Sequence, residues 1–285
     1  ITMAVLGVIG VLGAIVWLCY AKDPLVKLTV LKDRNFATGM FLISMVGATL
    51  YSSAIIVPQF AQQVLGYTAT TSGLLLAPGG VAIIILIPFV GRLMKFIQLR
   101  YLIAFGFFFM GMAMFQAANL YAGIDFRHLV FYRITQTASL AFLFVPISTI
   151  AYSTLPRELN SDASALFSMA RNYVGSMAIS LATAAIIETR QRHQTYVTDN
   201  MTPGRQEFTN YINQAQAVGE AHGLTPAAAH TFAIHRLFAE FTSQISMLAY
   251  NEVFRWIGII AMFVVPLCFL LSPNSTKKTE PAGGH

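Results

Sequence analysis

The sequence predicts an all-α integral membrane protein with seven transmembrane spans. Of the 285 residues, 56% are hydrophobic and only 11% are charged, and the mean hydropathy is +0.63. Because a soluble domain carries about 25% charged residues, too little charged surface remains to enclose a water-soluble globule. The long apolar runs are continuous rather than alternating, which favours membrane helices over the strands of a β-barrel.

A helix needs about 20 mostly apolar residues to cross a bilayer, and seven segments of the chain meet this requirement. The second, fifth and sixth of them are long enough to tilt or to extend beyond the lipid. In chain order, the predicted spans are 1–20, 36–65, 72–90, 101–120, 129–155, 163–187 and 250–271.

Basic residues predict the orientation of these spans. The two short loops on one side, 66–71 and 121–128, contain a single Lys or Arg, which is Arg127. Short loops rich in Lys and Arg stay in the cytoplasm, so the chain should start outside and end in the cytoplasm. The net charge is +6. We expect the basic residues to contact anionic lipid headgroups and to fix the topology, not to bind nucleic acid. The basic residues on the predicted cytoplasmic side are Lys22, Lys27, Lys32, Arg34, Arg92, Lys95, Arg100, Arg157, Lys277 and Lys278.

The spans and loops divide the chain into three parts. Residues 1–35 hold one span and a cytoplasmic linker, and residues 36–271 form a six-helix domain with a long outside loop at 188–251. The polar tail 272–285 is expected to be disordered. An odd number of spans, with an outside start and no leader, predicts the C-terminal part of a longer protein.

Two helices are expected in the long outside loop. Thr202-Pro203 and Thr225-Pro226 each combine an N-cap residue with proline at the first helical position, and His222-Gly223 is typical of a helix end. The second helix carries an apolar stripe, which packing against the protein or against interface lipid explains better than a docked partner. The stripe consists of Phe232, Leu237, Phe238, Phe241 and Ile245.

The sequence does not predict an enzyme. It contains no GxSxG, HExxH or Walker A motif and no pair of carboxylates inside a span. Cys19 and Cys268 each lie in an apolar run, so neither a disulfide framework nor a metal site can be built from them. A seven-helix receptor or a non-transporting membrane scaffold would share this topology. A retinal photoreceptor is disfavoured, because no lysine lies inside a span.

Arg133 is the clearest charged residue within a span, and Gln136 lies one turn further along the same helix face. A charged side chain in the bilayer costs about 2.5–3.5 kcal/mol on insertion scales, so it normally faces protein or water. Two alternatives remain open at this point. The guanidinium lines a polar cavity, or it extends to the outer headgroups.

The second span ends in polar residues. Ser52, Gln59 and Gln63 recur at helical spacing, and Tyr51 lies deeper. Polar side chains at this depth either line a cavity or form hydrogen bonds between helices.

Several short motifs are spread over nearly the whole chain: Asp23-Pro24-Leu25-Val26, Leu31-Lys32-Asp33-Arg34-Asn35-Phe36, Leu65-Gly66-Tyr67-Thr68-Ala69-Thr70, Ala77-Pro78-Gly79-Gly80, Arg171-Asn172-Tyr173-Val174-Gly175-Ser176 and Asn251-Glu252-Val253-Phe254. Together they resemble the EmrB-type multidrug efflux permeases, which are fourteen-span drug:proton antiporters of the major facilitator superfamily. Arg133-Ile134-Thr135-Gln136 is similar to the Arg-x-x-Gln element that the family carries in its N-terminal half.

The resemblance implies the C-terminal six-helix domain of the major facilitator superfamily fold, preceded by one inserted span. It also implies a proton-driven antiporter of the bacterial inner membrane that works by alternating access, with the proton gradient in place of any cofactor. The missing N-terminal half would carry the proton-coupling carboxylate, and a periplasmic adaptor and an outer-membrane channel would be partners. Amphiphilic drugs would bind between the halves, and the expected lining is Tyr51, Gln59, Gln63, Arg133, Gln136 and Phe144.

Overall fold

The computed structural model describes residues 28–121, 123–198 and 206–271, together with Gly7, Ile9, Gly10, Gly13 and Val16. Most of the predicted first span, the linker that holds Lys22 and Lys27, and the tail 272–285 lie outside these described residues. The described residues form helices joined by short turns and contain no strand.

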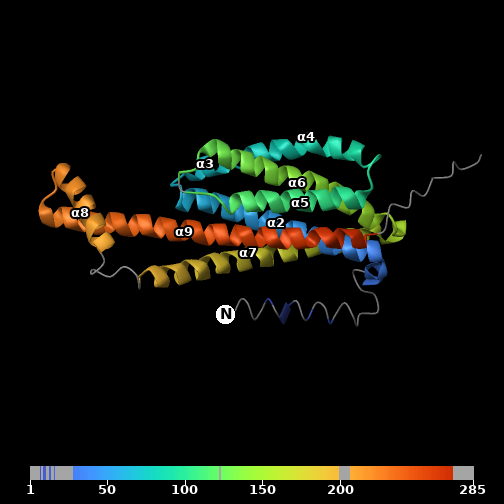
Figure 1. Ribbon diagram of the computed structural model, residues 1–285. Coiled ribbons are helices and arrows are strands. Elements are labelled where there is room, and N and C mark those ends of the chain that lie inside the picture. The colour runs from blue at the N-terminus through green and yellow to red at the C-terminus, as the bar shows by residue number, and fades with distance from the viewer. Residues whose placement is uncertain are drawn as a thin grey trace, which may run out of the picture.

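In the described residues, eight α-helices follow the short 3-10 helix η1 (Leu28–Lys32). The helices are α2 (Arg34–Gln63), α3 (Ala69–Leu74), α4 (Ala77–Leu93), α5 (Leu99–Ala117), α6 (Phe126–Tyr152), α7 (Asn160–Thr198), α8 (Gln206–Ala221) and α9 (Pro226–Leu267). A second 3-10 helix, η2 (Arg157–Leu159), lies between α6 and α7, and a third, η3 (Cys268–Leu270), follows α9. Figure 1 shows a bundle of helices with α8 beyond one end of it.

Five segments are long and apolar enough to cross a membrane, and they coincide with five predicted spans. They are Arg34–Gln63, Ala69–Leu93, Leu99–Ala117, Phe126–Tyr152 and Pro226–Leu270. The predicted third span is broken between α3 and α4, because Pro78 at the start of α4 has no N–H with which to continue the hydrogen-bond ladder.

The predicted sixth span, 163–187, lies within α7, a helix of 39 residues that is not among the five apolar segments. Serine and threonine recur along it, and Arg171 and Asn172 lie near its middle. Its reduced apolar character indicates that α7 does not face lipid all round.

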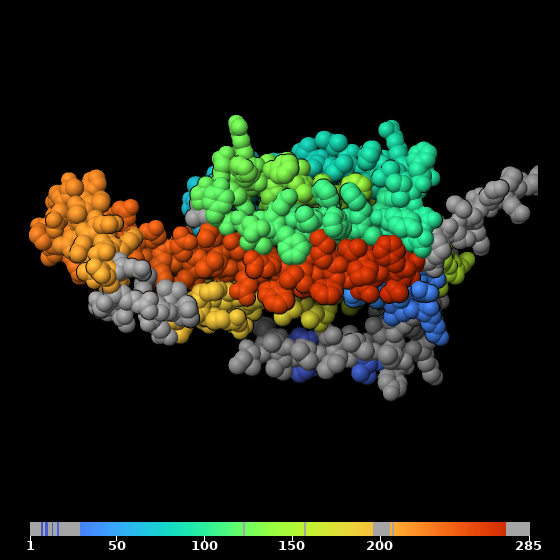
Figure 2. Space-filling model, in the orientation of Figure 1, coloured from blue at the N-terminus to red at the C-terminus, as the bar shows by residue number. Residues whose placement is uncertain are grey.

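The helices pack in two rows. In the first, α4 packs against α6, α6 against α2, and α2 against α7. In the second row, α5 and α9 pack against each other. The two rows are joined where α5 contacts α6 and where α9 contacts both α2 and α7. On the face shown in Figure 2, α9 lies between α5 and α7. The largest fully buried side chains include Phe36, Phe60, Phe107, Tyr250 and Phe254.

The α2–α7 contact depends on a close approach of the two backbones. A Cβ atom placed on Gly47 of α2 would lie 2.5 Å from the carbonyl oxygen of Arg171 on α7. Small residues at such crossings let membrane helices gain van der Waals contact that larger side chains prevent.

Outside the bundle, α8 and the first part of α9 form a helical hairpin. Thr225 caps α9 by accepting a hydrogen bond from the N–H of Ala228, and Gly223 has a φ of +84° at the turn. The predicted helix start at Thr225-Pro226 and the predicted helix end at His222-Gly223 are therefore confirmed. The other predicted start, Thr202-Pro203, lies outside the described residues. Of the predicted apolar stripe, Ile245 is buried and Leu237 packs on the α8 cluster around Ile212, whereas Phe238 is exposed. The predicted loop boundaries at 188 and 251 fall inside continuous helices.

The Tyr211 hydroxyl donates a 2.5 Å hydrogen bond to Glu240, linking α8 to α9. This bond raises the pKa of Tyr211, because the carboxylate stabilises the protonated phenol. A raised folded-state pKa adds stability at pH values below the unfolded pKa, and this stability is lost as the pH rises through the folded pKa.

We expect Tyr211→Phe to destabilise the hairpin at pH 7 by less than about 1 kcal/mol, because the contact is exposed to solvent. Hydrogen exchange of α8 should rise, while exchange in α5 stays unchanged. Equal protection of α8 in both proteins would contradict the expected role of the bond.

Candidate functional site

Arg133 and Gln136 form a buried polar junction between α6 and α2. The Arg133 guanidinium donates a 2.6 Å hydrogen bond to Oε1 of Gln136, and Nε2 of Gln136 donates a 2.5 Å bond to Oγ of Ser53. Arg133 is only 5% exposed, and its Nε has no partner among the described residues. No carboxylate pairs with it in this part of the chain. The guanidinium therefore lies inside the bundle and does not extend to the headgroups.

A buried guanidinium that is held only by neutral groups is costly, since its attraction to an opposite charge is missing. The amide of Gln136 supplies the strongest compensating contact, because a hydrogen bond from a charged donor is stronger than one between neutral groups. Thr137 also bonds to the backbone oxygen of Arg133, and Gly79 of α4 lies against both side chains. The junction therefore connects α2, α4 and α6.

Tyr51 and Phe144 belong to a second polar group, where α2 and α6 meet α7. The Tyr51 hydroxyl donates a 2.8 Å hydrogen bond to Oδ1 of Asn172. The Arg171 guanidinium carbon lies 5.9 Å from the centroid of the Phe144 ring, within the range of a cation–π contact. The ring of Tyr51 packs over Gly175, where a larger residue would collide with it. Aromatic, amide and guanidinium groups thus meet within one part of the bundle.

Asn172 belongs to a polar stripe on α7 that the sequence interpretation missed. At 3.6 residues per turn, residues four apart lie on nearly the same face, and these residues are exposed or half-buried. The face toward α9 instead carries Ala178, Leu181 and Ala182. The four-residue repeat of small polar residues could have revealed the stripe from the sequence. Its members are Asn172, Ser176 and Ser180.

Gln63 and Gln59 lie apart from both groups. Oε1 of Gln63 accepts hydrogen bonds from Arg190 at 3.1 Å and from the Tyr250 hydroxyl at 2.9 Å. Gln63 thereby joins α2, α7 and α9 at the end of the bundle nearest α8. The side chain of Gln59 is half-buried and makes no hydrogen bond with the described residues.

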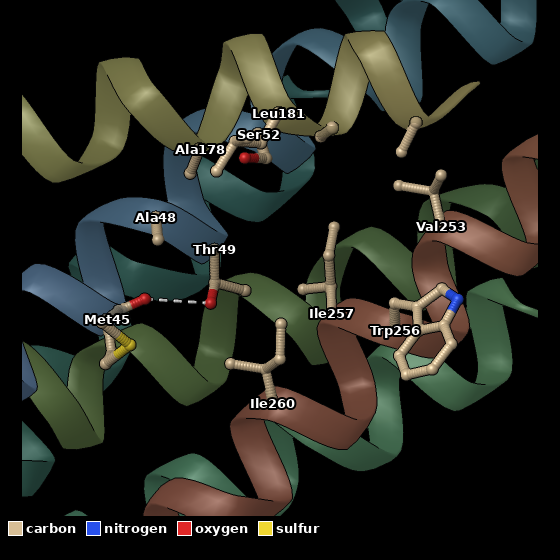
Figure 3. A pocket seen from close by; sticks show the side chains of 12 residues that line it. Met45, Ala48, Thr49, Ser52, Ala178, Leu181, Val253, Trp256, Ile257 and Ile260 are labelled. Carbon is tan, nitrogen blue, oxygen red and sulfur yellow. Dashed lines mark hydrogen bonds between the residues drawn. The ribbon is translucent and has the colours of Figure 1, made fainter. Parts of the chain in front are cut away.

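The described residues border several cavities, and none of the six predicted site residues lines the following three. Figure 3 shows an apolar cavity of about 250 Å³ between α2, α7 and α9, where Thr49 hydrogen-bonds its own helix at Met45. A second apolar cavity, of about 410 Å³, includes Phe105 and Phe142. A polar cavity of about 550 Å³ lies near the α8 end and includes His193 and Glu252.

No family model matches the chain. It is 28% identical over its whole length to the multidrug export protein EmrB of Escherichia coli strain K12, of which it covers 54%. It is 27% identical, over 98% of its length, to the probable multidrug resistance protein EmrY of the same strain and covers 53% of that protein. The fatty acid resistance protein FarB of Neisseria gonorrhoeae is 25% identical over the whole chain, which covers 54% of FarB. The chain thus spans about half the length of these relatives.

The chain is also 22% identical, over 90% of its length, to the uncharacterized MFS-type transporter YhcA of Bacillus subtilis strain 168, of which it covers 48%. The helices, the apolar segments and this similarity define an all-α integral membrane protein with the fold of the major facilitator superfamily. More particularly, the relatives named EmrB and EmrY confirm the resemblance of this chain to the EmrB-type multidrug efflux permeases.

Proposed function

We propose that the chain is the C-terminal half of a proton-driven multidrug efflux permease of the bacterial inner membrane. The polar face formed by Tyr51, Asn172 and the α7 stripe carries this proposal. Polar residues within a membrane domain normally face protein or water rather than lipid. The face lies away from α9, so it is available to a second half of the transporter. The multidrug export relatives favour this function over a seven-helix receptor or a scaffold.

In this proposal, amphiphilic drugs bind between the two halves, and alternating access moves them across the membrane. Tyr51 and Phe144 would offer ring faces to varied apolar groups, and Asn172 would offer an amide for hydrogen bonds. The buried Arg133–Gln136 junction would hold α2 and α6 in register behind this face.

The coupling proton would be taken up outside this chain. The first four apolar segments and residues 163–187 hold no Asp or Glu, and neither does the run from Trp256 to Leu270 of the fifth segment. Glu240 and Glu252 of the fifth segment precede that run. A carboxylate in the missing N-terminal half is therefore proposed as the proton carrier, and the proton gradient would supply the energy without a cofactor. A periplasmic adaptor and an outer-membrane channel would complete the export path.

Loss of the Tyr51–Asn172 bond should weaken efflux. In the complete permease, Tyr51→Phe and Asn172→Ala each remove one partner of this bond. We expect each variant to lower drug resistance about threefold or more at matched expression, because losing one hydrogen bond has an effect of this size. Asn119→Ala is the control, because Asn119 bonds only to its own helix, at Phe115. Equal resistance in all three variants would remove the polar face from the proposed binding site.

The proposed orientation has its own test. Lys95 lies between α4 and α5, and Asn210 lies on α8; both are exposed. A single cysteine at 210 should react with an impermeant maleimide in intact cells, whereas one at 95 should react only after the membrane is opened. Labelling of position 95 from outside would reverse the proposed topology.

A further inference from the structure

The apolar and polar cavities near α9 share one residue, Trp256. Glu252, Trp256 and Ile260 follow one another at one-turn intervals on α9, so they form one line along the helix surface. Glu252 lines the polar cavity and Ile260 lines the apolar one. The two cavities therefore adjoin at Trp256, and together they follow a path along α9 with a charged part and an apolar part on either side of that residue.

The polar cavity presents both signs of charge. Nε2 of His193 lies 3.7 Å from a carboxylate oxygen of Glu252, and both side chains are about one-third exposed. Arg255 is exposed and makes no hydrogen bond or ion pair with any other described residue. Asn251 donates a 2.8 Å hydrogen bond to the carbonyl of Leu120, which leaves its buried Oδ1 without a donor in the same part of the chain.

The path crosses the expected membrane boundary. Glu252 and Arg255 are the last charged residues of α9 before the apolar run from Trp256 to Leu270. Tryptophan is enriched at the level of the lipid headgroups, where its ring is apolar and its N–H polar. The polar cavity thus lies at headgroup depth, and the apolar cavity lies at the depth of the acyl chains.

We propose that the two cavities together bind one phospholipid with a primary ammonium headgroup, from the leaflet at the α8 end. The ammonium would contact the Glu252 carboxylate, and the phosphate would contact Arg255. One acyl chain would lie past Trp256 in the apolar cavity, against Ala182 and Ile260. The site is independent of the proposed transport function.

The chemistry of the polar cavity selects among headgroups. A trimethylated ammonium has no N–H to donate to the Glu252 carboxylate, so it loses the charge-assisted hydrogen bond that a primary ammonium makes. An anionic headgroup without an ammonium brings a second negative charge close to the Glu252 carboxylate. The apolar cavity near Phe105 has no charged residue in its lining, so lipid there should show no such preference.

Native mass spectrometry of the complete chain tests the proposal. The protein would be incubated with equal amounts of ethanolamine, choline and glycerol phospholipids with identical acyl chains. We expect about tenfold preferential retention of the ethanolamine lipid, the effect of one charge-assisted contact. Glu252→Gln should abolish most of this preference. Arg255→Gln should instead lower retention of all three lipids, because each of them carries a phosphate. Ala178→Leu, which fills the apolar cavity, should lower retention of all three lipids.

The controls are Glu188→Gln and Arg127→Gln, which remove exposed charges outside the three cavities. Both should keep the wild-type preference. Equal retention of the three lipids by the wild-type protein would overturn the proposal, as would an unchanged preference in Glu252→Gln or unchanged retention in Arg255→Gln. Competition by water-soluble glycerophosphoethanolamine as strong as that by the lipid would also overturn it, because the acyl chain would then contribute nothing.

Discussion

Gln136→Leu should destabilise the bundle by about 2–4 kcal/mol, because it leaves the buried guanidinium of Arg133 without its hydrogen-bond acceptor. An average hydrogen bond between membrane helices contributes only about 0.6 kcal/mol, so the stranded charge dominates the expected loss. Ser53 remains satisfied, since its hydroxyl also bonds to the carbonyl of Leu50. The unfolding midpoint in mixed detergent micelles, followed by circular dichroism, measures the effect.

Arg133→Met provides the matched comparison. Replacing a buried charge by an apolar side chain of similar length is often neutral or stabilising, so we expect this variant alone to change stability little. In the double variant with Gln136→Leu, most of the lost stability should return, because no charge remains to be compensated. A double variant as unstable as Gln136→Leu alone would show that the loss arises from packing and not from the charge.

Gly47→Ala should cost about 1–3 kcal/mol, because the added methyl group collides with the backbone of Arg171 and forces α2 and α7 apart. The collision outweighs the gain of about 1 kcal/mol that alanine normally brings to a helix interior. Thermal unfolding of the purified protein in detergent measures the change. Because α7 carries the proposed polar face, drug resistance of the complete permease should fall in parallel.

Gly80→Ala on α4 is the control for Gly47→Ala. A Cβ at Gly80 meets nothing within 4 Å, so this substitution keeps the gain in helix propensity and lacks the collision. It should leave stability unchanged or raise it. A loss of similar size in both variants would contradict the expected close approach of α2 and α7.

The spans were predictable because the bilayer imposes a length and an apolar composition on each crossing. The predicted spans 36–65 and 129–155 match α2 and α6 closely. Local signals were also sufficient at Thr225, which caps α9, and at Gly223, which adopts a positive φ. Such features depend on a few neighbouring residues, so the sequence displays them directly.

Contacts between distant residues were not predictable in the same way. The spacing of Arg133 and Gln136 indicated their pairing, but Ser53, which completes the junction, is 83 positions from Gln136. The hydrogen bonds of Gln63 to Arg190 and Tyr250 were not predictable either. Its two partners are 127 and 187 positions away, so only the packing of α2 against α7 and α9 brings them together.

The unbroken course of α9 has a mechanical consequence. Its 42 residues measure about 60 Å at 1.5 Å per residue, of which about 30 Å is enough to cross the hydrocarbon layer. The remainder acts as a lever arm that ends at α8. A tilt of about 10° in the membrane part would move the far end by about 6 Å over an arm of about 35 Å. Small rearrangements among the spans are thereby amplified into a displacement outside the membrane that a pair of fluorescent labels can report.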